Sequence, residues 1–443
     1  MVIDRQILRL SLPAIASNVT VPLLGICDTA IAGHLGSPLF LAAIGVGSVM
    51  LNVVFWVFGF LRMGTTGLTA NALGASDGKE IRRVFSRSFF LALIAGIILI
   101  ALQAPLFELL LGLVKAEEEV GENVLTYFNI RIWGAPALLA TMAMTGWLVG
   151  MQTTLLPMII SISMNIINIL MSLLFVFVIQ KGFAGIALGT MISNWAGMGI
   201  GIACCLKMSK GKKLFSKVRE ICSFEGIGKF FRVNSALFIR SLCIICVTLG
   251  LTAAGARLGA MALAVNVIVM QFFQFFSFFM DGFAFSGEAL TGLYAGKKEG
   301  YMLSLTVKHL LMWTLSMGVA FSLIYFVGAE EICRWLSDSP EVADGVASLL
   351  VVIGLIPIIS AWAFIYDGFY VGLADTKLMM IATIIASAVF FIITFPPFPD
   401  MYNSLGLNGN ERIWTGFLFY LALRGIILAA CWKKKVRGMR LEV

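Results

Sequence analysis

The stretch that decides the fold is Leu10-Ser-Leu-Pro-Ala-Ile-Ala-Ser-Asn-Val-Thr-Val-Pro-Leu-Leu-Gly-Ile-Cys-Asp-Thr-Ala-Ile-Ala-Gly-His34. It is long and apolar enough to cross a bilayer as one helix. It nevertheless carries Asp28 and two prolines, Pro13 and Pro22. A carboxylate inside a membrane span costs several kcal/mol unless it is paired, hydrated or protonated, so such residues mark ion or proton pathways. Because proline removes a backbone hydrogen bond, we predict a helix hinge at Pro22 and hypothesise that Asp28 couples a cation to a conformational cycle.

The composition of the whole chain places it in the membrane. Of its 443 residues 60% are hydrophobic and 13% charged, with a mean hydropathy of +0.96. The apolar residues fall in runs of about twenty or more, which predicts an all-α polytopic membrane protein. A β-barrel would show alternating segments of about ten residues, and these are absent. The cysteines show neither metal-ligand spacing nor a disulfide framework, and no cleavable signal peptide is recognisable.

Hydropathy predicts twelve transmembrane helices in two lobes of six. A basic cytoplasmic linker, 208–228, separates a first lobe, 1–207, from a second lobe with a basic tail, 229–443. The predicted spans are 7–34, 39–73, 84–113, 120–149, 153–180, 183–207, 229–256, 260–295, 302–328, 342–373, 377–397 and 413–432.

Charge sets the predicted orientation. With both termini in the cytoplasm, most lysines and arginines fall in cytoplasmic segments, including the linker and the tail. The opposite side then holds only five, which are Lys115, Lys181, Arg257, Arg334 and Arg412. This asymmetry follows the positive-inside rule and accounts for the net charge of +8 without nucleic acid. We therefore expect a multi-pass protein with the lipid bilayer as its surroundings and no nucleic-acid partner. We also expect a bacterial inner (plasma) membrane as its location and a monomeric state.

The two lobes show an internal duplication. The segment Gly146-Trp-Leu-Val-Gly-Met-Gln-Thr-Thr-Leu-Leu-Pro-Met158 aligns with Gly368-Phe-Tyr-Val-Gly-Leu-Ala-Asp-Thr-Lys-Leu-Met-Met380, an offset of 222 (368 minus 146). Six helices in each repeat give the repeats the same orientation, related by a pseudo-two-fold axis along the membrane normal. Secondary transporters with alternating access use this two-lobed plan.

Several further charged residues fall within the predicted spans. In addition to Asp28, this intramembrane charge network comprises Arg62, Arg131, Arg240, Asp281, Glu288 and Asp367. One interpretation is that Arg240, Asp281 and Glu288 form fixed ion pairs, because opposite charges in hydrocarbon attract each other. For Asp28 we favour the coupling role. Its candidate polar neighbours are Asn165, Asn168, Ser172 and Thr190, although such groups also form ordinary interhelical hydrogen bonds.

Motifs for other functions are absent. The sequence contains no P-loop, HExxH or GxSxG, and its two histidines show no partnering pattern. We therefore expect neither an enzyme nor a metal site, and no cofactor other than a coupling ion. A lipid-linked oligosaccharide flippase remains the alternative function, since Arg62, Arg131 and Arg240 would suit a pyrophosphate group.

The whole chain resembles the multidrug and toxic compound extrusion (MATE) transporters, and within them the DinF-like branch. The segments that carry the resemblance are Asn18-Val-Thr-Val-Pro-Leu-Leu-Gly-Ile-Cys-Asp-Thr-Ala-Ile-Ala-Gly-His-Leu-Gly36, Phe60-Leu-Arg-Met-Gly-Thr-Thr-Gly-Leu-Thr-Ala70, Ile130-Arg-Ile-Trp-Gly-Ala-Pro136, Gly146-Trp-Leu-Val-Gly150, Arg240-Ser241, Asp281-Gly-Phe-Ala284, Glu288-Ala289 and Asp367-Gly368.

The resemblance implies an antiporter that exports organic, often cationic, drugs or metabolites by alternating access, driven by protons or sodium. It implies that Asp28 takes part in cation coupling and that the first helix bends at Pro22 when Asp28 is protonated. It also assigns Asn168, Ser172 and Thr190 to the cation cluster of the first lobe. Relatives have an acid at the position of Ser172. Its loss here favours protons over sodium, with Asp28 as the principal carrier. Another branch has a coupling glutamate in the seventh helix, where this chain has Arg240, so that arrangement is not expected here.

Overall fold

The computed structural model describes residues 2–35, 37–114, 118–211, 213–221, 226–336, 339–395 and 409–440, and these residues form helices joined by short loops. The helices of the first half are α1 (Val2–Gly33), α2 (Pro38–Val57), α3 (Phe60–Gly74), α4 (Gly78–Ala101), α5 (Gln103–Val114), α6 (Glu118–Arg131), η1 (Ile132–Gly134), α7 (Ala135–Gly150), α8 (Leu155–Leu173), η2 (Leu174–Val178) and α9 (Phe183–Met208). Those that follow are α10 (Val218–Ile221), α11 (Ile227–Arg257), α12 (Ala260–Gly296), α13 (Gly300–Leu336), α14 (Pro340–Ser348), α15 (Leu350–Gly372), α16 (Thr376–Thr394) and α18 (Gly409–Arg440).

Twelve segments of this helical structure are long and apolar enough to cross a membrane, which confirms the predicted all-α polytopic class. They are Val2–Gly33, Pro38–Gly74, Gly78–Ala101, Val120–Gly150, Leu155–Val178, Phe183–Met208, Ile227–Arg257, Ala260–Gly296, Gly300–Trp335, Leu350–Gly372, Thr376–Thr394 and Gly409–Val436. A helix suits this environment because it satisfies its backbone hydrogen bonds within one segment.

Two predicted spans are wrong in their limits. The span 84–113 contains a break at Leu102, where α4 ends and α5 begins one residue later. Pro105 explains the break, since a proline has no N–H with which to continue the hydrogen bonds of α4. The span 342–373 is likewise divided at Leu349 into α14 and α15. Here the Leu349 N–H donates to Val346 O at 3.0 Å, a tightened final turn.

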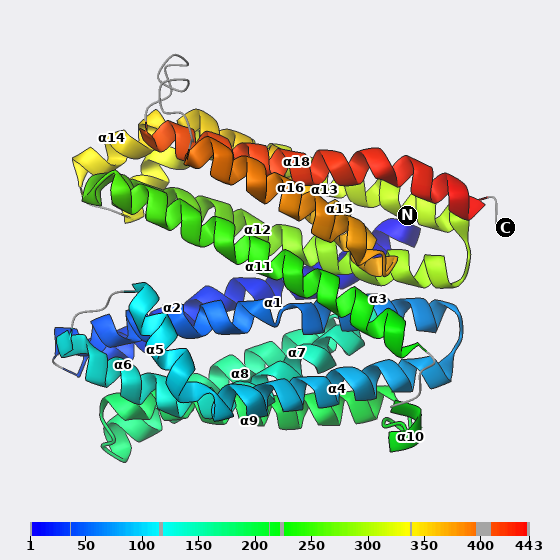
Figure 1. Cartoon of the computed structure of the whole chain (residues 1–443), viewed down its shortest axis with the longest axis horizontal. Coiled ribbons are helices and arrows are strands. Elements are labelled where there is room, and N and C mark those ends of the chain that lie inside the picture. Colours follow the sequence, from blue (N-terminus) through cyan, green and yellow to red (C-terminus); the bar gives the residue numbers. More distant parts are fainter. Residues whose placement is uncertain are drawn as a thin grey trace. The chain divides into compact units, whose positions relative to one another are not determined.

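Chain contacts divide the protein into two compact units (Figure 1). One unit comprises Leu12–Asn234 and the other Met1–Ser11 with Ser235–Val443. We call them the N-unit and the C-unit. This division differs from the predicted lobes because the first eleven residues group with the second half of the chain. The linker packs on the N-unit, where Arg87 Nε donates to Ile221 O at 3.1 Å and Ser216 N–H donates to Ser86 Oγ at 2.9 Å.

The beginning of α1 is held on the C-unit by side-chain hydrogen bonds. Asp4 Oδ1 accepts from His309 Nδ1 at 2.8 Å and from Trp313 Nε1 at 3.1 Å, both on α13. The Tyr294 hydroxyl of α12 donates to Gln6 Oε1 at 2.9 Å, and the hydroxyls of Ser11 and Ser286 lie 2.7 Å apart. These bonds explain why α1 is divided between the two units.

The internal duplication appears in the backbone of both units. The non-glycine residues Ser76 and Lys298 both have left-handed φ, of 58° and 60°. Gln152 and Ala374 form a second such pair, with φ of 66° and 54°. Both pairs are related by the offset of 222 found in the sequence.

Close helix contacts repeat at the same offset. A Cβ at Gly150 would lie 2.8 Å from Thr66 O, and one at Gly372 would lie 2.7 Å from Glu288 O. Thr66 and Glu288 are again 222 residues apart. The glycines are therefore required in both repeats because a helix backbone approaches at that point.

Candidate functional site

Asp28 lies on α1 and is 7% exposed. Its Oδ1 atom has no hydrogen-bond partner among the described residues. Pro13 and Pro22 both fall inside α1, which continues as one helix through them. A buried carboxylate oxygen without a donor is costly in a medium of low polarity. Asp28 is therefore placed to take up a proton or a small cation.

Arg131 is the cation that acts electrostatically on Asp28. It is the last residue of α6, and its Nη1 atom donates to the Tyr127 hydroxyl at 2.7 Å, one helical turn earlier. Its guanidinium carbon also lies 5.2 Å from the centre of the Tyr127 ring. Tyr127 contacts Ser48 as well, with 3.2 Å between the two hydroxyl oxygens. The sequence prediction missed Tyr127, although its spacing from Arg131 (i, i+4) favours such a contact.

The structure brings Asn168, Ser172 and Thr190 together between α8 and α9. Asn168 Nδ2 donates to Thr190 Oγ1 at 2.9 Å, and Thr190 Oγ1 donates to Ile186 O at 3.2 Å. Asn168 Oδ1 and Ser172 Oγ are buried, and neither has a hydrogen-bond partner within the part of the chain that the structure describes. This cluster therefore offers two buried oxygens. No hydrogen bond between described residues joins it to Asp28.

A stripe of small residues sets the spacing of α8 and α9, which pack side by side (Figure 1). The stripe occupies every fourth position of α9, at Gly185, Gly189, Ser193, Gly197 and Gly201. A Cβ at Gly189 would lie 2.7 Å from Ser172 N and 2.9 Å from Ser172 Cα. Small residues at this spacing let membrane helices approach closely. The sequence contained this signal, but the prediction did not use it.

Two local features lie beside the cluster. Two residues after Ser172, at Leu174, the helix changes to the π-turn η2, in which Ile179 N–H donates to Leu174 O at 2.9 Å. Such turns occur frequently at functional sites. On α8, Asn165 Nδ2 donates to Thr20 Oγ1 at 3.1 Å and lies 3.4 Å from Thr20 O. Asn165 thus binds α1 two residues before Pro22.

In the C-unit one buried carboxylate binds two arginines. Asp367 on α15 accepts from both Arg240 on α11 and Arg424 on α18. Arg424 Nη1 also donates to the Tyr420 hydroxyl at 3.1 Å, and all four residues are buried. Asp367 is therefore a carboxylate partner of Arg240, and both residues were placed in the charge network from the sequence without being paired.

The remaining residues of the predicted charge network lie elsewhere on the same helices. Glu288 is buried on α12, and Asp281 lies two turns earlier, partly buried. Arg62 is partly buried on α3, and its carbonyl accepts from Thr66 Oγ1 at 2.9 Å. Arg424 was not included in the predicted network, although it is a charged residue within a predicted span.

Comparison with known proteins identifies the family. The family model described as MatE matches residues 13–174 and 236–395, one segment in each half of the chain. The chain is 32% identical to DNA damage-inducible protein F of Escherichia coli (strain K12), over 98% of this chain and 93% of that protein. It is 27% identical to the probable multidrug resistance protein NorM of Thermotoga maritima, over 98% of this chain and 94% of that protein.

Solved structures show the same fold. A crystal structure of MATE in the bent conformation has a TM-score of 0.87 at 18% identity, covering 99% of this chain and 97% of that chain. MATE in the straight conformation has a TM-score of 0.85 at 17% identity, with the same coverage. The family match over both halves of the chain, together with these relatives, identifies a transporter and not an enzyme. The chain belongs to the MatE family of multi-pass multidrug efflux transporters, with DNA damage-inducible protein F among its relatives.

Proposed function

We propose that this transporter is a proton-coupled antiporter that exports organic, often cationic, compounds by alternating access. Asp28 carries the coupling proton, and α1 bends at Pro22 when that carboxyl is protonated. The observation that carries the proposal is the buried Oδ1 atom of Asp28, which has no hydrogen-bond partner among the described residues. A neutral carboxyl costs less than a carboxylate in this environment, so uptake of a proton stabilises the buried state.

The polar cluster of Asn168, Ser172 and Thr190 in the N-unit supports a proton more than sodium. A small cation is held by several oxygen ligands, and carboxylates are the strongest of these. Asn168 Oδ1 and Ser172 Oγ supply neutral oxygens, and a serine stands where the resemblance expects an acid. The cluster thus adds no carboxylate to that of Asp28, which neutralises one added charge.

The proposed orientation has both termini in the cytoplasm of a bacterial cell, the chain lying in its inner membrane as a monomer. The excess of lysines and arginines on the side of the termini supports this orientation. Alternating access then exposes Asp28 to opposite sides of the membrane in turn. A proton enters from outside as the substrate leaves.

Contacts of the arginines weigh against the flippase alternative. Arg131 is engaged with Tyr127, while Arg240 and Arg424 both bind Asp367. A site for a pyrophosphate group needs guanidinium groups that are available to the ligand. These contacts therefore favour the exporter.

The test is efflux of an organic cation dye from vesicles under an imposed pH gradient, with and without sodium. We expect wild type to export dye without sodium and Asp28→Asn to export no more than vesicles lacking the protein. Glu108→Gln is the matched control, because Glu108 is an exposed carboxylate of the same unit. Equal export by wild type and Asp28→Asn would reject the role of Asp28. A sodium requirement at fixed pH would reject the proton.

A further inference from the structure

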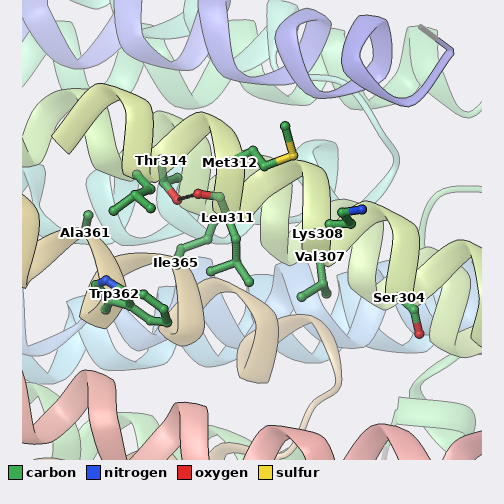
Figure 2. Close-up of a pocket in the computed structure, with 10 residues that line it drawn as sticks. Ser304, Val307, Lys308, Leu311, Met312, Thr314, Ala361, Trp362 and Ile365 are labelled. Atoms are coloured by element: carbon green, nitrogen blue, oxygen red, sulfur yellow. Dashed lines mark hydrogen bonds between the residues drawn. The ribbon is translucent and has the colours of Figure 1, made fainter. Parts of the chain in front are cut away.

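A cavity of about 340 Å³ opens between α13 and α15 in the C-unit. Figure 2 shows Lys308, Leu311 and Met312 on α13, and Trp362 and Ile365 on α15. Its volume is at the lower end of the range for ligand pockets, which suits a narrow ligand. Met312 and Trp362 are exposed (58% and 41%), so the cavity is accessible from the surface of the unit.

The lining is apolar except at one end. The Thr314 hydroxyl is satisfied within its own helix, with 2.9 Å to Leu310 O and 3.2 Å to Leu311 O, the latter drawn dashed in Figure 2. Lys308 is the one charged residue among those that line the cavity. Its exposed ammonium group makes no ion pair or hydrogen bond with any described residue. The cavity therefore combines an apolar interior with a cation that is available to a ligand.

The sequence of α13 fixes the depth of this cation in the bilayer. No charged residue occurs from Leu310 to Ala329, and the next charge is Glu330. These twenty residues span about 30 Å at 1.5 Å per residue, the thickness of the hydrocarbon core. Lys308 therefore lies at the headgroup level, and the apolar part of the cavity lies beside the acyl chains.

We propose that this cavity binds an anionic phospholipid of the cytoplasmic leaflet, with the lipid phosphate at Lys308 and one acyl chain between α13 and α15. The leaflet follows from the proposed orientation, in which α13 begins on the cytoplasmic side. That leaflet carries the anionic lipids, and each lysine near its surface attracts them. A cationic substrate is disfavoured at the same place because the lysine repels it.

The proposed lipid site lies beside the attachment of α1. The residue after Lys308 is His309, which donates to Asp4, and Trp313 donates to the same carboxylate one turn later. A lipid that fills the groove between α13 and α15 stabilises the surface on which the start of α1 rests. We therefore expect bound anionic lipid to raise the melting temperature of the C-unit.

The experiment measures lipid binding to the purified full-length protein by native mass spectrometry, with melting temperature as a second readout. Phosphatidylglycerol and phosphatidylcholine with identical acyl chains are compared, and glycerol phosphate tests the headgroup alone. We expect wild type to prefer phosphatidylglycerol, and glycerol phosphate to have no effect. Lys308→Gln lowers the affinity about fivefold, which corresponds to the attraction of one lysine for an anionic membrane surface.

Two variants complete the design. Leu315→Trp fills the cavity from an exposed position and is expected to weaken binding of both lipids. Lys377→Gln removes an exposed lysine at the start of α16, outside the cavity, and is expected to match wild type. Equal affinity for the two lipids, or an equal loss in Lys308→Gln and Lys377→Gln, would overturn the proposal. No gradient is used, so failure of the coupling role of Asp28 leaves these results unchanged.

Discussion

Substitution of Gly189 by alanine tests whether the spacing of α8 and α9 maintains the polar cluster. The new Cβ would lie 2.7 Å from Ser172 N, whereas ordinary contacts begin at 3.4 Å. The backbone of α8 cannot rotate away as a side chain can, so α9 must move outward by about 0.7 Å, the difference between these distances. The same movement stretches the Asn168–Thr190 hydrogen bond from 2.9 Å to about 3.6 Å, beyond hydrogen-bonding distance.

Overpacking of this kind lowers the free energy of unfolding by about 1–3 kcal/mol. Loss of the interhelical hydrogen bond lowers it by about 0.6 kcal/mol more. We expect Gly189→Ala to melt at least about 2 °C below wild type and to export dye more slowly under a pH gradient. The assays are thermal unfolding of the purified protein and dye efflux from vesicles.

Gly199→Ala is the matched control, because a Cβ at Gly199, on the same helix, would meet no atom within 4 Å. It should leave both the melting temperature and efflux at wild-type values. The reasoning is refuted if Gly189→Ala behaves as wild type. It is also refuted if Gly199→Ala shows the same losses, since the effect would then not depend on the approach to Ser172.

Two further predictions concern buried polar contacts. Asp367→Asn replaces the carboxylate that Arg240 and Arg424 share by a neutral amide, which leaves two buried guanidinium groups without their counter-charge. We therefore expect the free energy of unfolding to fall by about 3–5 kcal/mol, measured by thermal unfolding. Arg334→Gln, which removes an exposed ion pair with Glu330, should lower the free energy of unfolding by at most about 1 kcal/mol. Equal losses in the two variants would show that burial does not strengthen the ion pair. Asn165→Leu removes the donor to Thr20 near Pro22, so we expect about 0.6 kcal/mol of destabilisation and an altered rate of dye efflux. An unchanged melting temperature together with unchanged efflux would show that this bond does not restrain α1.

The sequence by itself determined the number and type of the membrane segments. Each helix in hydrocarbon must satisfy its backbone within its own segment, so local hydropathy is sufficient to find it. The internal duplication could also be recognised from the sequence, because the glycines at 146 and 150 recur at 368 and 372. The breaks at Leu102 and Leu349 were not predicted, since hydropathy does not distinguish one long helix from two short ones.

For the candidate site, the sequence indicated Asp28 because a carboxylate is costly in an apolar membrane helix. It indicated Asn168 and Ser172 because residues four positions apart lie on one face of a helix. The tertiary structure alone showed that Thr190 binds Asn168, that Tyr127 holds Arg131, and that the start of α1 belongs to the C-unit. It also decided that Arg240 and Arg424 share Asp367, residues that are more than fifty positions apart in the chain. Such contacts depend on which faces of two helices meet and how closely they approach, and hydropathy records neither.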